Sequence, residues 1–181
     1  MARIDPPKPH SVILDEPGRL EITIPVRTNW FVACFLGAWL TGWLVGEVTV
    51  PITMVTNAQK APLPFMIFWL TAWTVGGGFA IMVFLWQILG REIIRVENNS
   101  IMTKRAIGPW GRAHEFDREH VKNLRVDPHG INFFDSASAL KFWGLGGGLI
   151  AFDYGSKTFR FGRGIDEPEA RRIIELMERH R

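Results

Sequence analysis

Five residues that can bind metal ions or transfer protons lie close together in the second half of the chain. They are His114, Glu115, Asp117, Glu119 and His120. On an extended strand the two histidines would point to one face and the three acids to the other, and no H-x-x-x-H spacing occurs. A solvated strand end with a polar turn therefore explains the cluster better than a metal centre does, and we predict no metal site.

The glycines between residues 144 and 148 suggest a second kind of chemistry, the binding of a phosphate. A phosphate loop needs a Lys followed by Ser or Thr and a helix whose N-terminus meets the anion, but Leu149 and Ile150 begin a strand here. No G-x-S-x-G motif occurs, and the single cysteine, Cys34, lies in an apolar stretch. We therefore expect no cofactor, no small-molecule substrate and no enzymatic activity.

The segment around these glycines carries more apolar surface than a solvated loop requires. Its large side chains are Phe133, Phe134, Phe142, Trp143 and Leu145. They either fill the core of a domain, enter the bilayer interface or contact another subunit. We treat the last two alternatives together as a candidate partner or membrane contact.

Basic residues form the remaining candidate site. Arg91, Arg95, Lys104, Arg105 and Arg112 would hold anionic lipid head groups if they converge, and each cation near a membrane surface contributes about 1 kcal/mol. The alternative is ordinary surface charge, balanced by the acids of the same region. A net charge of +3 is too small to favour nucleic acid as a partner.

Two long apolar stretches precede these candidate sites in the chain. Residues 30–90 contain only two charged side chains, Glu47 and Lys60. Residues 30–50 and 65–89 each exceed the roughly 20 apolar residues that span a hydrocarbon core. The sequence predicts a transmembrane helical hairpin over residues 29–90 that is retained as an anchor, with Glu47 near a helix end where it reaches water.

The positive charges predict how this hairpin is oriented. Four Lys or Arg residues precede it, one lies in the connecting loop, and sixteen follow it. The positive-inside rule then places both chain termini in the cytoplasm. The spans contain no His, Lys, Arg or Asp, which argues against a proton relay, an ion path or a haem within them.

Small residues recur every four positions in both spans, which allows helix backbones to approach closely. The three stripes are Ala33, Gly37 and Thr41; Ala38, Gly42 and Gly46; and Ala72, Gly76 and Ala80. Packing of the two spans on each other explains them sufficiently. The more specific interpretation is that two stripes on the first span exceed what one partner helix needs, so that one of them meets another protein.

Outside the spans the pattern changes to short strands. Alternating apolar residues and turn signals predict strands at 93–96, 101–107, 112–116, 121–126, 149–154 and 158–161. Asp166 and Glu169 make an N-terminal capping arrangement for a last, amphipathic helix. Residues 1–28 are interpreted as a cytoplasmic tail and a β-hairpin that returns to join or cover the same sheet.

The order of these segments carries a resemblance to a known family. The hydrophobic hairpin is followed by REIIRVENNSIMTKRAIG, then HVKNLRV, then LIAFDYGSKTFRFGRGIDEPEARRIIELMERH. Over residues 91–180 this resembles bacterial membrane-anchored proteins with a pleckstrin-homology-like domain. The resemblance implies an α+β membrane protein of the bacterial inner membrane. In it, a cytoplasmic antiparallel β-barrel or sandwich at residues 91–181 is capped by the C-terminal helix.

Domains of this kind usually bind or scaffold rather than catalyse. We therefore expect a non-catalytic accessory subunit that stabilises a larger membrane protein complex, for example a respiratory or photosynthetic one, with the bilayer and other membrane subunits as partners. The alternative is a free-standing module that binds anionic lipid head groups. A third class, a transporter or enzyme component, would need polar groups supplied by another chain.

Overall fold

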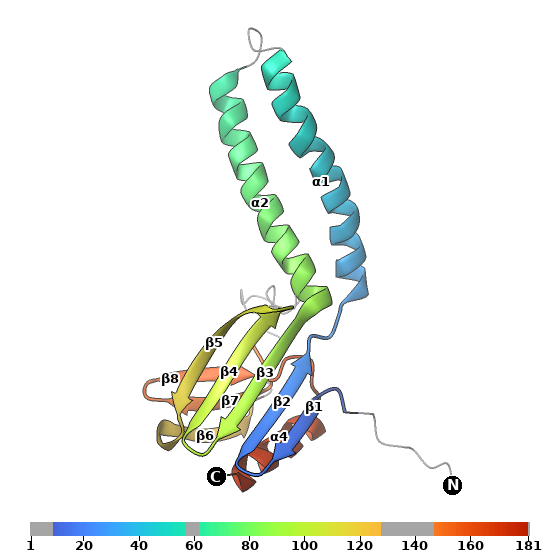
Figure 1. Cartoon of the computed structure of the whole chain (residues 1–181). Helices are drawn as coiled ribbons and strands as arrows, with labels where there is room; N and C mark the ends of the chain where they lie inside the picture. Colours follow the sequence, from blue (N-terminus) through green and yellow to red (C-terminus); the bar gives the residue numbers. More distant parts are fainter. Residues whose placement is uncertain (1–8, 57–61, 128–146, 181) are drawn as a thin grey trace, which may run out of the picture. The chain divides into compact units, whose positions relative to one another are not determined.

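The computed structural model describes residues 9–56, 62–127 and 147–180 and has an α+β architecture (Figure 1). It divides into two compact units. A helical unit comprises Thr28–Ile88, and a β unit combines Met1–Arg27 with Leu89–Arg181. The β unit thus includes residues that precede the helices as well as residues that follow them.

The helical unit consists of α1, Trp30–Thr56, and α2, Leu63–Leu89. Each helix has 27 residues and is long and apolar enough to cross a membrane, judged by length and composition. Because α1 continues six residues past the predicted end at Val50, Glu47 lies nine residues before the end of the helix, about 13 Å along its axis. The expectation that Glu47 sits near a helix end is therefore wrong.

The β unit contains two antiparallel sheets. The first has the strand order β1-β2-β3-β4-β5, and the second has the order β6-β7-β8. The bounds are β1 Val12–Glu16, β2 Arg19–Pro25, β3 Gly90–Glu97, β4 Ser100–Ile107, β5 Trp110–Asp117, β6 Val121–Val126, β7 Ile150–Tyr154 and β8 Lys157–Phe161. Every strand predicted from the sequence is present, within a few residues at each end.

The N-terminal hairpin is part of the first sheet, so that of the two predicted alternatives it joins the sheet rather than covers it. β2 pairs antiparallel with β3, and Ile22 lies opposite Ile94 although the whole helical unit separates them in sequence. Both isoleucines are buried, so this long-range pairing extends the hydrophobic face of the sheet. A fragment starting at residue 91 would lack both β1 and β2.

The strands do not close into a barrel in the part of the chain that the structure describes. Instead, β5 leads through the short 3₁₀ helix η1, Arg118–His120, into β6, which pairs with β7. The two sheets share one hydrophobic core, to which both contribute buried side chains such as Ile94 and Phe152. Of the two predicted forms, a barrel or a sandwich, the closed barrel is therefore wrong, because the described strands form two open sheets around a common core.

The last helix, α4, spans Glu167–Arg179 and completes this core. The Asp166 side chain caps it by accepting a hydrogen bond from the Glu169 backbone N–H at 2.9 Å, as the capping pattern predicted. Ala170, Ile173 and Met177 form its buried face. Local sequence signals therefore sufficed to place this helix.

Candidate functional site

The five basic candidates do not share one face of the sheet. Residues directly opposite on neighbouring strands point to the same side, and residues alternate along each strand. Arg105 lies opposite both Glu92 and Arg112, so these three share the inner face. Arg91, Arg95 and Lys104 occupy the other face by the same register. The sequence prediction grouped five basic residues that the structure divides between the two faces of the sheet.

Two of the three outer-face cations already have acceptors within the chain. Arg95 Nη2 lies 3.0 Å from Glu21 Oε2, and Arg91 Nη2 donates to the Gly108 carbonyl at 3.0 Å. Glu21 also accepts from Arg19 at 2.8 Å, and these partners, Arg19 first, lower the pKa of the Glu21 carboxyl. A head group would have to compete with these contacts.

A buried carboxylate lies on the inner face of the same sheet. Glu92 is only 3 % exposed. Its Oε2 accepts hydrogen bonds from the backbone N–H groups of Gly162 at 2.8 Å and Arg163 at 3.1 Å. Its Oε1 lies 3.2 Å from Arg105 Nε and 3.4 Å from Arg163 Nε. Glu92 thus joins β3 and β4 to the segment between β8 and α4.

Burial next to Glu92 also changes the pKa of Arg163. The pKa of Arg163 is lowered to about 10, first because burial removes solvent and second because Arg105 is nearby, while Glu92 opposes both effects. Sequence reasoning missed this cluster. The available signal was alternation, because Glu92 occupies the same inward series as Ile94 and Val96, where a charged residue requires a partner.

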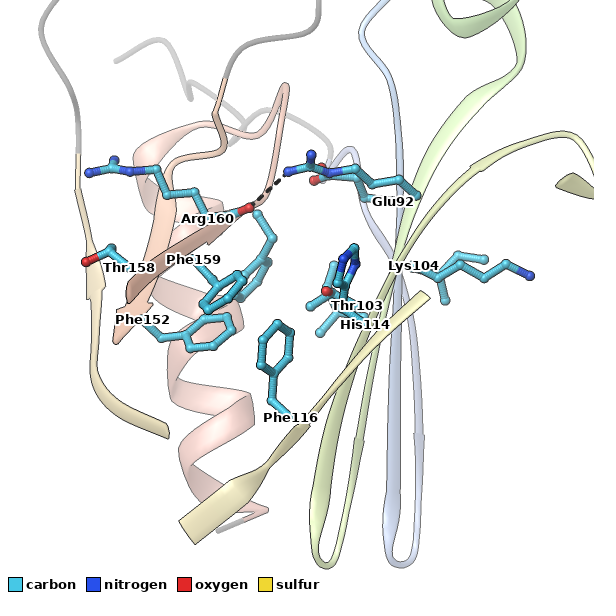
Figure 2. Close-up of a pocket in the computed structure, with 13 residues that line it drawn as sticks. Glu92, Thr103, Lys104, His114, Phe116, Phe152, Thr158, Phe159 and Arg160 are labelled. Carbon is cyan, nitrogen blue, oxygen red and sulfur yellow. Dashed lines mark hydrogen bonds and ion pairs between the residues drawn. The ribbon is translucent and has the colours of Figure 1, made fainter. Parts of the chain in front are cut away.

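A cleft of about 340 Å³ opens between the two sheets next to this cluster. Figure 2 shows Phe116, Phe152 and Phe159 grouped between the strands, while Lys104 points away from them. Phe116 packs edge to face against both other rings, with centroids 4.6 Å from Phe159 and 5.1 Å from Phe152, whereas Phe152 and Phe159 are stacked at 5.7 Å. Thr103 adds a hydroxyl to the lining, so the cleft has an aromatic floor with a few polar groups.

The His and acid cluster is dispersed by the fold. His114 lines the cleft, whereas Asp117 accepts a hydrogen bond from the Glu119 N–H at 3.3 Å and caps η1. His120 Nδ1 lies 3.3 Å from Asp117 Oδ2 at the surface. In the described ranges, no group of three or more His, Cys, Asp or Glu residues could hold a metal ion.

The glycine-rich segment is described only at its end. Gly148 lies against the backbone of β8, where an added Cβ would come within 1.8 Å of the Phe161 carbonyl oxygen. Only glycine permits this approach, which fits a close backbone contact better than a phosphate cradle. The candidate contact residues Phe133, Phe134, Phe142, Trp143 and Leu145 lie outside the described residues.

In the helical unit, aromatic rings contact the small residues. Phe84 packs over Gly37, and Trp73 packs over Gly46. The closest approach is at Gly77, where an added Cβ would lie 2.0 Å from Trp43 Cε2. Gly77 belongs to none of the predicted stripes. The two helices therefore contact each other where aromatic rings pack against glycines. The spacing of small residues alone does not predict this pattern.

The predicted stripes divide into covered and uncovered positions. Ala33 and Ala80 are buried, whereas Ala38, Thr41, Gly42, Ala72 and Gly76 are exposed in the hairpin. A Cβ added at Gly42 or Gly76 would meet nothing within 4 Å. Thus α1 and α2 each retain exposed small residues that their mutual contact does not use.

Polar contacts also link the two helices. Trp43 Nε1 donates to the Trp73 carbonyl at 3.1 Å, and the Thr74 hydroxyl donates to Glu47 Oε1 at 2.7 Å. The second oxygen of Glu47 and the indole N–H of Trp73 are buried without a hydrogen-bond partner among the described residues. Glu47 is therefore a contact between helices as well as the only acid of the hairpin.

Comparisons with protein families, curated proteins and solved structures find no match for this chain. The resemblance to pleckstrin-homology-like domains stays a prediction that rests on the order of the sequence motifs. The features of the chain that bear on its function are the hairpin surface, the Glu92 cluster and the cleft.

Proposed function

We propose that this chain is a non-catalytic membrane anchor and scaffold that stabilises a larger membrane protein complex. The helical hairpin inserts in the bacterial inner membrane with both chain termini in the cytoplasm, where the pleckstrin-homology-like β unit lies. Insertion is supported by large apolar side chains that the two helices leave exposed, among them Phe31, Val55 and Phe68.

The observation that carries the scaffold proposal is the set of uncovered small residues. Membrane helices associate through close packing, and small side chains allow it because they leave room for the partner backbone. Gly42 and Gly76 are exposed, and a Cβ added at either position would meet nothing within 4 Å, so the hairpin itself does not need them to be glycine. A helix from another subunit gives these positions a role.

Substitution at these two positions tests the proposal in the full-length chain. We expect Gly42→Leu and Gly76→Leu to lose co-purifying subunits after gentle solubilisation, measured by native mass spectrometry, while the hairpin stays folded. Val45→Leu is the matched control, because Val45 is exposed on the same helix and is already large. Recovery of the unaltered chain only as a monomer would contradict the scaffold role.

Insertion itself can be tested separately. We expect the chain to stay in the membrane fraction during alkaline carbonate washing, and we expect its β unit to resist protease added outside sealed cells. Release by carbonate, or digestion of the carboxyl half from outside, would contradict the proposed topology.

A second candidate function is the binding of anionic lipid head groups. The specific observation in its favour is that Arg91, Arg95 and Lys104 share the outer face of the first sheet. The full chain in nanodiscs tests it, because a fragment of residues 91–181 lacks β1 and β2. Salt-sensitive retention of anionic lipid that Lys104→Ala and Arg91→Ala abolish would favour this role. Retention that both changes leave intact would contradict it.

A further inference from the structure

We propose that the cleft between the two sheets binds a fatty acid, with the hydrocarbon chain on the phenylalanines and the carboxylate at Arg105. This ligand site is independent of the scaffold role, because it lies entirely within the β unit.

The aromatic floor indicates the apolar part of the ligand. Phe159 is half-buried at the cleft and offers apolar surface to a ligand, whereas Phe116 and Phe152 are 5 % and 1 % exposed and pack against it within the core. Ligand pockets are typically apolar with a few placed polar groups and begin at about 300 Å³, which this cleft of about 340 Å³ just reaches. A single hydrocarbon chain suits this space, and a phospholipid with two chains is larger than it.

The charges at one end indicate the head group. Among the described residues, Glu92 is the only acid that lines the cleft, and its oxygens are already engaged by two backbone N–H groups and two guanidinium groups. Arg105 shares this carboxylate with Arg163. The Arg105 side chain is also 49 % exposed, whereas that of Glu92 is 4 % exposed. An incoming anion therefore meets an accessible cation and a carboxylate that is shielded by its partners.

The remaining polar groups are consistent with a carboxylate. Thr103 and His114 line the cleft and lie opposite each other on β4 and β5, so both can donate hydrogen bonds from the inner face of the first sheet. Arg160 is engaged elsewhere, because its Nη2 lies 2.6 Å from Asp127 Oδ2. In Figure 2 the Arg160 side chain points away from the phenylalanines. Arg105 Nη2 donates to the Arg160 carbonyl at 3.3 Å, but the Arg105 side chain stays 49 % exposed, so it is the cation best placed for the ligand.

Photolabelling of the full-length chain in nanodiscs tests the site. The probe is decanoate that carries a diazirine at the end of its chain, followed by peptide mapping. We expect label in the peptides that contain β5, β7 and β8, and we expect excess decanoate to compete better than decanol, which lacks the charge. Label confined to α1 and α2, or equal competition by decanol, would overturn the proposal.

Variants separate the charge from the cavity. Loss of a charge-assisted contact in Arg105→Ala should raise the half-saturating decanoate concentration roughly tenfold, and Arg105→Lys should recover part of the loss. Arg172→Ala is the matched control, because Arg172 is an exposed arginine on α4 and does not line the cleft. Equal binding by the Arg105→Ala and Arg172→Ala variants would overturn the role of Arg105.

A substitution that fills the cleft tests the site without removing the ion pairs that stabilise the fold. Thr103→Phe adds bulk inside the cleft and leaves the contacts of Glu92 in place, so we expect it to block labelling while hydrogen exchange of β3 stays unchanged. Undiminished labelling of this variant, or label on the unaltered protein only outside the cleft, would overturn the proposal. Neither result depends on a partner subunit, so failure here is distinct from failure of the scaffold role.

Discussion

The β unit and the helical unit differ in where they place their apolar side chains. In the β unit Leu20 and Ile150 are completely buried within a core that both sheets and α4 share. In the helical unit Phe31 is 75 % exposed and Val55 is 81 % exposed. The β unit thus carries its own hydrophobic core. The hairpin leaves most of its apolar surface for whatever surrounds it, as the proposed membrane anchor requires.

Polar groups follow the same division. The buried carboxylate of the β unit, Glu92, is satisfied by groups from β4 and from the segment between β8 and α4. The single acid of the hairpin, Glu47, has one oxygen bonded to Thr74 and the other buried without a partner among the described residues. The β unit thus satisfies its buried acid internally, whereas the described residues of the hairpin leave both apolar surface and one carboxylate oxygen without a partner.

The largest expected effect breaks the β unit alone. Glu92→Ala would remove the buried carboxylate that two guanidinium groups and two backbone N–H groups share. Removal of one partner of a buried ion pair typically costs about 3–5 kcal/mol of the free energy of unfolding. Hydrogen exchange of the full chain should show faster exchange in β3 and β8 and unchanged exchange in α1 and α2.

The control for this change is Glu115→Ala, because Glu115 is exposed on β5. Its effect should stay within about 0.5 kcal/mol, as is usual for surface substitutions. Equal effects at the two glutamates would contradict the structural role of Glu92.

The next effect breaks the hairpin alone. Gly77→Ala places a methyl group where the Trp43 ring lies, and overpacking of this kind costs about 1–3 kcal/mol. Six of the eight tryptophans belong to the helical unit, so tryptophan fluorescence during detergent-induced unfolding reports this change.

Gly78→Ala provides the matched control for the hairpin. A Cβ at Gly78 meets nothing within 4 Å, and alanine favours a helix over glycine by about 1 kcal/mol. This variant should therefore be slightly stabilised. Equal effects of Gly77→Ala and Gly78→Ala on stability would contradict the close packing of the Trp43 ring against Gly77.

A smaller loss of stability is expected when the caps at the starts of α4 and α1 are removed. Asp166→Ala removes the cap of α4 and should cost about 1 kcal/mol, seen as faster exchange of the first amides of that helix. Asn29→Ala removes a longer contact at the start of α1, where Asn29 Oδ1 accepts from the Val32 N–H at 3.4 Å. The second change should be the weaker of the two, and the reverse order would contradict this assignment of the caps.

The smallest effect is a dependence on pH that belongs to the β unit. Hydrogen bonds from Asn123, Thr158 and Arg125 lower the pKa of Asp153 to about 2. Because this value lies below the ordinary value of about 3.9, the contribution to stability is complete above that value. It is lost as the pH falls from about 4 to about 2.

Urea unfolding of the β unit, followed by hydrogen exchange between about pH 2 and pH 6, measures this contribution. Asp153→Asn should flatten the fall in stability at low pH, leaving a residual slope from Glu21, whose pKa is also lowered. Over this range, hydrogen exchange of α1 and α2 should depend on pH in the same way in the variant as in the unaltered chain. An unaltered slope in the Asp153→Asn variant would contradict the prediction.

The strands and the helix of the β unit could largely be predicted from local patterns. Alternation such as Phe159, Arg160 and Phe161 marks β8, and the capping residues mark α4. The candidate site could be predicted only in part. The basic residues were identified by type, but their division between two faces follows from the register of β3, β4 and β5, which the residue types alone do not reveal.

The sequence by itself determined where the chain is apolar, where strands alternate and where helices begin, because these properties depend on neighbours a few positions away. Only the tertiary structure decided that Glu92 meets Arg163, that Gly77 rather than Gly76 receives a tryptophan ring, and that a cleft opens beside the phenylalanines. Each of these depends on side chains brought together by packing between distant segments. Local periodicity does not encode such contacts.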